Sequence, residues 1–124
     1  MQMKQIKIDG KEINLECRPY SLTLYSREFE EKDLVEDAMK LVKGYQEGRI
    51  NANLQMQIIW CFAKTAKMKE NVRIFPSFED WLMGFEYLNM NNSDDQMVLV
   101  ELINERLFRE EKEEQPEPEQ QSAE

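Results

Sequence analysis

The chain has 124 residues, of which 41% are hydrophobic and 33% charged, and its formal net charge is −9. This balance is typical of a globular domain with one modest core and excludes a wholly disordered chain. The chain contains no histidine, which removes the commonest general acid–base group and metal ligand. Because the net charge is acidic, the surface repels nucleic-acid phosphates, and we expect no direct binding to DNA or RNA.

Membrane and redox classes are also disfavoured. The longest apolar run, Ile58–Ala63, is far shorter than the roughly 20 residues that cross a bilayer, and the first residues lack the apolar stretch of a secretory signal. We therefore expect a cytoplasmic protein that does not bind membranes. Cys17 and Cys61 have no metal-type spacing, and we interpret them as free, buried thiols.

Residues 3–17 are predicted to form a β-hairpin. Asp9-Gly10 indicates a two-residue type I′ turn, because both central residues of that turn need positive φ. A two-residue loop pairs Ile6 with Ile13, whereas a four-residue loop shifts the register by two. Both registers place the same side chains on one apolar face. A lone hairpin is marginal in water, so this face must pack on the helices or on another chain.

Five helices and a polar tail are expected after the hairpin. The predicted helices cover about residues 21–30, 33–46, 53–68, 77–89 and 93–109. Their predicted N-terminal caps include Ser21, Asp33, Ser77 and Ser93. The third helix is the most apolar and is predicted to form the core. Residues 110–124 contain no large apolar side chain and are predicted to be a disordered acidic tail. The expected fold is therefore mainly α, with the hairpin packed on about five helices in a single domain, 1–109.

The sequence shows no catalytic or metal-binding pattern. No serine or cysteine can have a histidine base. Acidic pairs such as Glu79-Asp80 and Asp94-Asp95 fall at predicted helix starts, where negative charge is stabilised by the helix dipole. The glycines are isolated and form no phosphate-binding loop. We expect a non-enzymatic protein with no cofactor and no metal.

Three pairs of apolar residues lie off the main apolar face of their predicted helices. Each pair has i, i+4 spacing and forms a small second stripe. The pairs are Met56/Trp60, Met83/Tyr87 and Val98/Leu102. One interpretation is that each stripe is covered within the domain. The other is that it binds another chain, because methionine and aromatic side chains suit adaptable apolar recognition. Our hypothesis is that at least two of these pairs contact a partner.

The order of the segments resembles a known family. The strand–Asp-Gly–strand unit of residues 3–15, followed by Ser21-Leu22 and an all-helical body, is similar to the tail assembly chaperones of long-tailed, non-contractile bacteriophages and prophages of Gram-positive hosts. The segment Phe75-Pro76-Ser77-Phe78-Glu79-Asp80-Trp81-Leu82 and the Glu-rich C-terminus are also similar to that family. The resemblance covers roughly residues 3–110 and is one of order, size and composition.

The resemblance implies a non-catalytic role in the cytoplasm of the host bacterium. Such chaperones bind the tape measure protein, a long and largely helical chain, and keep it soluble until tail-tube subunits polymerise around it. They are not kept in the mature virion, and many are also made in a longer, frameshifted form. The implied partner is the tape measure protein, with the tail tube protein as a second candidate.

A homo-oligomer is a further candidate state, because self-association would give avidity along a long client. The unpaired edge of the hairpin is one route to it. Lys4 and Lys7 instead favour a protected edge, and the sequence leaves both alternatives open.

The alternative class is a small acidic inhibitor, such as a toxin-immunity protein or a DNA mimic, which matches a basic partner with clustered carboxylates. Residues 109–124 hold seven acidic and two basic side chains, so residues 1–108 carry only −4. Inhibitor binding should weaken steeply with salt, whereas binding of an apolar client should not.

Overall fold

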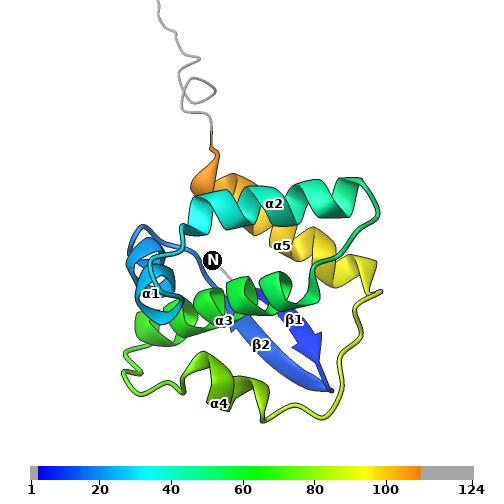
Figure 1. Ribbon diagram of the computed structural model, residues 1–124. Helices are drawn as coiled ribbons and strands as arrows, with labels where there is room; N and C mark the ends of the chain where they lie inside the picture. The colour runs from blue at the N-terminus through cyan, green and yellow to red at the C-terminus, as the bar shows by residue number, and fades with distance from the viewer. Residues whose placement is uncertain (1–2, 110–124) are drawn as a thin grey trace, which may run out of the picture.

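The computed structural model describes residues 3–109. Its elements in chain order are β1 (Lys4–Ile8), β2 (Lys11–Leu15), α1 (Tyr20–Glu28), α2 (Leu34–Gln46), α3 (Ala52–Lys69), α4 (Phe78–Leu82) and α5 (Ser93–Leu107). The predicted fold class, an N-terminal hairpin followed by helices, is confirmed for these residues (Figure 1). The predicted disorder of 110–124 concerns residues outside the described part.

The hairpin has the shorter of the two predicted loops. Ile6 pairs with Ile13 and Ile8 with Lys11, which leaves Asp9 and Gly10 as the two turn residues. Both turn residues have positive φ, 54° and 73° respectively, as a type I′ turn requires. The side chains of Ile6 and Ile8 are buried. The hairpin therefore packs its apolar face on the helices, as a two-stranded sheet must.

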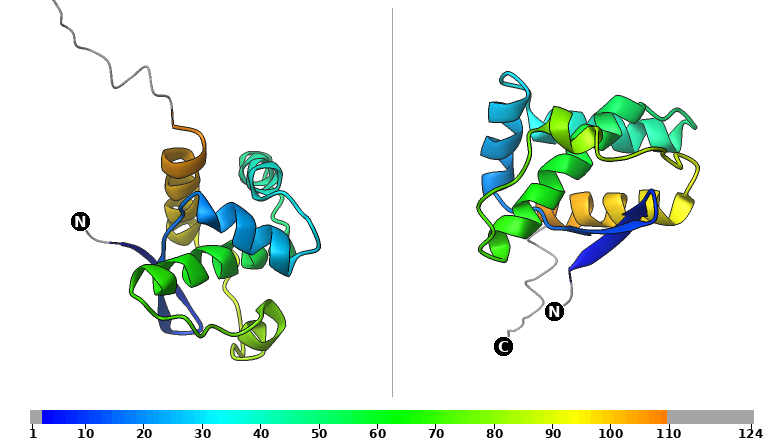
Figure 2. Two further views of the ribbon diagram at one scale, coloured as in Figure 1. Left: turned by 90° about the vertical axis from the view of Figure 1, so that its left-hand side faces the viewer. Right: turned by 90° about the horizontal axis from the view of Figure 1, so that it is seen from below.

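α3 crosses the middle of the molecule, with α2 on one side and α4 on the other (Figure 1, Figure 2). It also contacts β2 and α1. Because these elements surround it, almost every residue of its central part is buried, including Gln55, Gln57 and Thr65. The prediction that this helix forms the core is confirmed.

The outer edge of the hairpin faces α5. The Asp95 carboxylate lies near the Lys7 backbone N–H, which acts to lower the pKa of Asp95, and Lys4 Nζ lies 3.5 Å from Glu101 Oε1. α5 therefore covers part of the β1 edge that would otherwise be open to another strand.

Two predicted helix caps are confirmed and two are wrong. Asp33 accepts a hydrogen bond from the Val35 N–H, and Ser77 accepts one from the Asp80 N–H. Asn92, not Ser93, caps α5. Ser21 lies inside α1, where its hydroxyl forms a 2.6 Å hydrogen bond with the Thr65 hydroxyl of α3. The inward direction of this side chain explains why it does not cap α1.

α4 is much shorter than the predicted helix over 77–89. After Leu82 the chain leaves the helix, and two residues of the hairpin bind the loop that follows. Lys11 Nζ donates to the Gly84 carbonyl at 2.8 Å, and Asp9 Oδ2 accepts from the Glu86 N–H at 2.9 Å. Glycine is a poor helix former, and these side chains satisfy backbone groups that a helix would otherwise pair.

Candidate partner-binding groove

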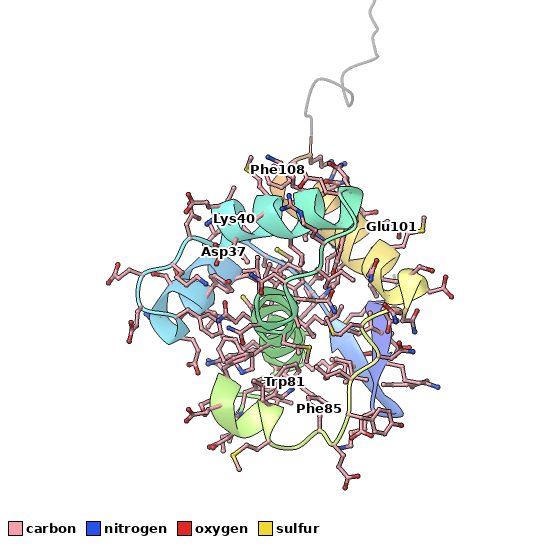
Figure 3. All side chains as sticks on the ribbon, turned by 45° about the vertical axis from the view of Figure 1, so that its right-hand side comes forward. Asp37, Lys40, Trp81, Phe85, Glu101 and Phe108 are labelled. Atoms are coloured by element: carbon pink, nitrogen blue, oxygen red, sulfur yellow. The ribbon has the colours of Figure 1, made fainter. Side chains whose placement is uncertain are left out.

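An open apolar groove lies between α2 and α5 and has a volume of about 640 Å³. Its lining residues are Glu36, Met39, Lys40, Val42, Lys43, Gln46 and Glu47 from α2 and its C-terminal end, with Asn104 and Phe108 from α5 and its C-terminal end. Figure 3 shows Lys40 and Phe108 on the same side of the molecule, away from Trp81 and Phe85.

The groove arises because the apolar arc of α2 is wider than its neighbours can cover. Leu34, Ala38 and Leu41 point into the core and are buried. Met39 and Val42 lie at the edge of this arc; the Met39 side chain remains 56% exposed and Val42 is half-buried. Exposed Phe108, at the C-terminal end of α5, contributes the apolar surface on the opposite side of the groove. An exposed methionine beside an exposed phenylalanine in a concave site is typical of partner-binding surfaces.

The three predicted pairs lie in different surroundings in the structure, and two of them are not surface stripes. Met56 and Trp60 are fully buried, because α3 is covered on all sides within its own domain. The Trp60 indole N–H donates to the Pro76 carbonyl at 3.1 Å, and its ring packs edge-on against Phe29. A surface stripe on this helix is therefore excluded in the folded chain.

The Val98/Leu102 pair is likewise not a free stripe. Leu102 is buried and Val98 packs half-buried against the core, because α5 contacts both β1 and α2. A helix that is held between two neighbours buries residues on two faces, which a wheel drawn for one covered face does not anticipate.

Met83 and Tyr87 are exposed, at 81% and 61%, but they do not form a helical stripe. α4 ends at Leu82, so the two residues lie on the loop held by the hairpin tip. This loop lies on the far side of α3 from α2 (Figure 1). The structure therefore brings no two of the predicted pairs together into one surface.

Met39, Val42 and Phe108 were not among the predicted site residues. On a helical wheel, the apolar residues of α2 fill one continuous arc, which is the usual sign of a helix that buries its whole apolar face. The sequence feature that could have indicated the groove is the width of this apolar arc, with the unbranched side chain of Met39 at its edge.

Two buried polar clusters join neighbouring elements of the fold. The Tyr25 hydroxyl donates to Asp37 Oδ2 at 2.6 Å, and Lys32 Nζ lies 3.1 Å from the same oxygen. Burial, and then the Asp37 carboxylate, raises the pKa of the Tyr25 hydroxyl, so it remains a neutral donor. The cluster joins α1, α2 and the intervening loop.

The second cluster surrounds the Glu16 carboxylate. It accepts a hydrogen bond from the Cys17 N–H at 2.9 Å and pairs with Lys69 at 3.2 Å and Arg106 at 3.3 Å. Burial alone would raise the pKa of Glu16, but these hydrogen bonds and positive charges outweigh it and lower the pKa below its usual value. The cluster ties the end of β2 to α3 and α5.

Residues 3–109 contain no helix long and apolar enough to span a membrane. Over the same range, no three cysteine, aspartate or glutamate side chains are grouped so as to hold a metal ion. Comparison of the chain with protein-family models, curated proteins and solved structures found no match.

Proposed function

We propose that this protein is a non-catalytic tail assembly chaperone of a long-tailed phage or prophage, and that its α2–α5 groove binds an apolar helical segment of the tape measure protein. The observation that carries the proposal is the exposed Met39 facing Phe108 across a groove of about 640 Å³. An amphipathic helix that seats its apolar face in such a groove is a recurring mode of recognition. The resemblance of residues 3–110 to tail assembly chaperones supplies the identity of the client.

The dimensions of the groove fit a short helical segment. Its α2 wall runs from Glu36 to Glu47, which is about 17 Å at the helical rise of 1.5 Å per residue. About three turns of a client helix fit along this length. Such a contact is smaller than the interface of a stable complex, so one site binds weakly. Many such segments along one client, each held by its own chaperone, would still keep the client covered.

The charge of the chain supports the same role. A client with exposed apolar stripes associates with itself unless those stripes are covered. A chaperone of net charge −9 adds negative charge with every copy that binds, and this repulsion keeps the loaded complex soluble.

Sequencing the DNA that flanks the gene is the first test of the proposal. We expect a very long downstream reading frame with helical apolar periodicity. Co-expression of that frame with this chain should move the long protein from the insoluble to the soluble fraction and allow both to be purified together. A neighbouring toxin or nuclease gene, with no long reading frame, would instead support the acidic-inhibitor alternative.

Two matched variants test the groove itself. Met39→Asp places a charge on the floor of the groove, whereas Met83→Asp makes the same change at an exposed methionine on the far side of α3. We expect Met39→Asp to abolish co-purification and Met83→Asp to preserve it. The opposite pattern would place the client on the loop after α4.

A further inference from the structure

The segment that joins α3 to α5 adds no buried residue to the core. In the described part of the chain, every residue from Lys67 to Val98 is exposed or half-buried. The helix of this segment, α4, has five residues and buries none of them. We call residues 71–92 the lid segment. Its apolar side chains that pack half-buried against the core from α4 and the loop after it are Phe78, Trp81, Leu82 and Phe85.

The lid segment covers two aromatic side chains of the core. Phe29, which follows α1, packs edge-on against Phe78, with 5.1 Å between the ring centroids. Trp60 of α3 donates from its indole N–H to the Pro76 carbonyl at 3.1 Å, and its ring centroid lies 6.2 Å from that of Phe75. Phe29 and Trp60 also contact each other. Together they form an aromatic surface beneath the lid segment, which we call the covered face.

Polar contacts at or near the surface also hold the lid segment. The Glu28 carboxylate accepts a hydrogen bond from the Phe78 N–H at 2.7 Å. Lys11 Nζ donates to the Gly84 carbonyl at 2.8 Å and lies 5.3 Å from the centre of the Phe85 ring. Water can replace exposed contacts of this kind at little cost. A segment with few buried apolar contacts opens at a lower free energy than the core does, so we expect the lid segment to open while α3 stays folded.

The lid segment has the sequence pattern of a helical ligand. Phe78, Trp81, Leu82 and Phe85 stand at positions i, i+3, i+4 and i+7, which is the spacing with which amphipathic helices dock in apolar grooves. Because α4 ends at Leu82, Phe85 reaches this surface from the loop and packs edge-on against Trp81 (Figure 3). A helix of another chain, free of the loop that interrupts α4, could present all four anchors on one continuous stripe.

We propose that the lid segment is a built-in ligand that opens locally, and that the covered face then binds an amphipathic helix of another protein with the same four anchors. The segment that occupies the face within the chain defines the chemistry of its replacement, which is a stripe rich in aromatic rings. The two occupants exclude each other, so the apparent dissociation constant is the intrinsic value divided by the open fraction. This inference goes beyond the proposed function, since α4 and the covered face lie on the opposite side of α3 from α2 (Figure 1).

Hydrogen exchange of the Trp60 indole N–H, followed by NMR on the full-length protein, measures the opening directly. This proton is bonded to the Pro76 carbonyl of the lid segment, so it exchanges when that segment opens. We expect its protection factor to be at least about tenfold lower than those of the α3 amides of residues 58–62. Low concentrations of urea should change it little, because local opening exposes little surface. Equal protection and equal urea dependence would show that the lid segment opens only with the whole domain, and would overturn the inference.

A matched pair of variants within the lid segment tests the competition. Phe78→Ala removes the ring contact with Phe29 and should lower the protection factor of the Trp60 indole by at least about threefold. Met83→Ala changes a side chain that is 81% exposed and should leave it unchanged. Leu82→Ala is a second loosening variant, and circular dichroism checks that each variant is folded.

The probe is a labelled synthetic peptide that copies residues 74–88 with Gly84→Ala, which favours a continuous helix. A peptide of the same composition in scrambled order is its control. In fluorescence anisotropy, Phe78→Ala should bind the probe at least about threefold more tightly than the wild type does, by the same factor as its change in protection. Tighter binding after the loss of an aromatic ring is expected only if that ring competes with the probe.

The outcomes that overturn the inference are distinct from a failure of the proposed function. Unchanged or weaker probe binding in Phe78→Ala would show that the covered face is not the site. Loss of probe binding in Met39→Asp would place the probe in the α2–α5 groove instead. Dimers of the wild type that dissociate in Phe78→Ala, with no binding of the probe, would show that copies of the chain exchange their lid segments. We expect Met39→Asp to bind the probe as the wild type does, whether or not the groove binds a client.

Discussion

Trp60 is the residue whose substitution tests the assignment of core and surface most directly. Its position on the helical wheel of α3 was as consistent with a surface residue as with a core residue, yet the structure buries it completely. The Phe29 ring lies 5.5 Å from the indole ring between centroids, and Phe75 lies 6.2 Å away. Trp60→Ala removes the largest side chain of the core, and Met83→Ala is the matched change at an exposed site.

The expected loss of stability in Trp60→Ala is large, because the cavity left by the indole ring would be enclosed on all sides by the core. Replacement of a buried tryptophan by alanine costs about 3–5 kcal/mol, from lost burial and the cavity that remains. The indole N–H bond to the Pro76 carbonyl adds little, because exposed Pro76 can bond to water instead. Met83→Ala should change the free energy of unfolding by less than about 0.5 kcal/mol. The free energy of unfolding of a domain of this size is about 5–15 kcal/mol in total, so Trp60→Ala should remove a large fraction of the stability.

Urea denaturation followed by far-UV circular dichroism measures both changes without using tryptophan fluorescence. The midpoint of Trp60→Ala should fall well below that of the wild type, and that of Met83→Ala should coincide with it. A loss below about 1 kcal/mol for Trp60→Ala, a value typical of surface sites, would refute the burial of α3 and would return Met56 and Trp60 to the surface.

Two further predictions concern buried ionisable groups. The folded-state pKa of Glu16 is lowered, so this carboxylate stabilises the fold above its unfolded pKa and loses that contribution as the pH falls through the folded value. Urea midpoints at pH 7 and pH 3 should therefore differ less in Glu16→Gln than in the wild type, and an equal pH dependence would contradict this. Burial raises the pKa of the Cys17 thiol to about 12, so at pH 8 almost none of it is thiolate. Reaction with a disulfide reagent should be slow in the native protein and fast in denaturant; fast native labelling would show that Cys17 is accessible.

The hairpin was predictable from sequence because its signals are local. Asp9-Gly10 fixes the turn through its backbone, and the alternation around it fixes the buried face. Asp33 and Ser77 were predictable as caps for the same reason, since a cap acts within its own first turn. The choice of Ser21 as a cap failed because a residue of α3, Thr65, forms a hydrogen bond with its hydroxyl.

The end of α4 depends on contacts between distant parts of the chain. The apolar spacing from Phe78 onward continues to favour a helix after Leu82. Lys11 and Asp9, more than 70 residues away in sequence, bind the backbone of the next loop instead. A pattern read along one segment contains no information about these partners, so the Met83/Tyr87 stripe was predicted on a helix that does not extend that far.

The same reasoning explains why the candidate groove lies on α2 and not on the most apolar helix. A helix whose central part is apolar on most faces lowers the free energy most by being surrounded, so α3 becomes the centre and the apolar residues of its central part, Leu54–Ala63, are buried. A helix with a single wide arc, such as α2, can bury the middle of the arc and still expose its edge. Met39 and Val42 are that edge. Because such an edge offers only a few apolar side chains, one site would bind a helix weakly, and under the proposed function many copies of the chain would be needed to retain a long client. Dilution should therefore release such a client from complexes of the milder variant Met39→Ala at higher concentrations than from the wild type.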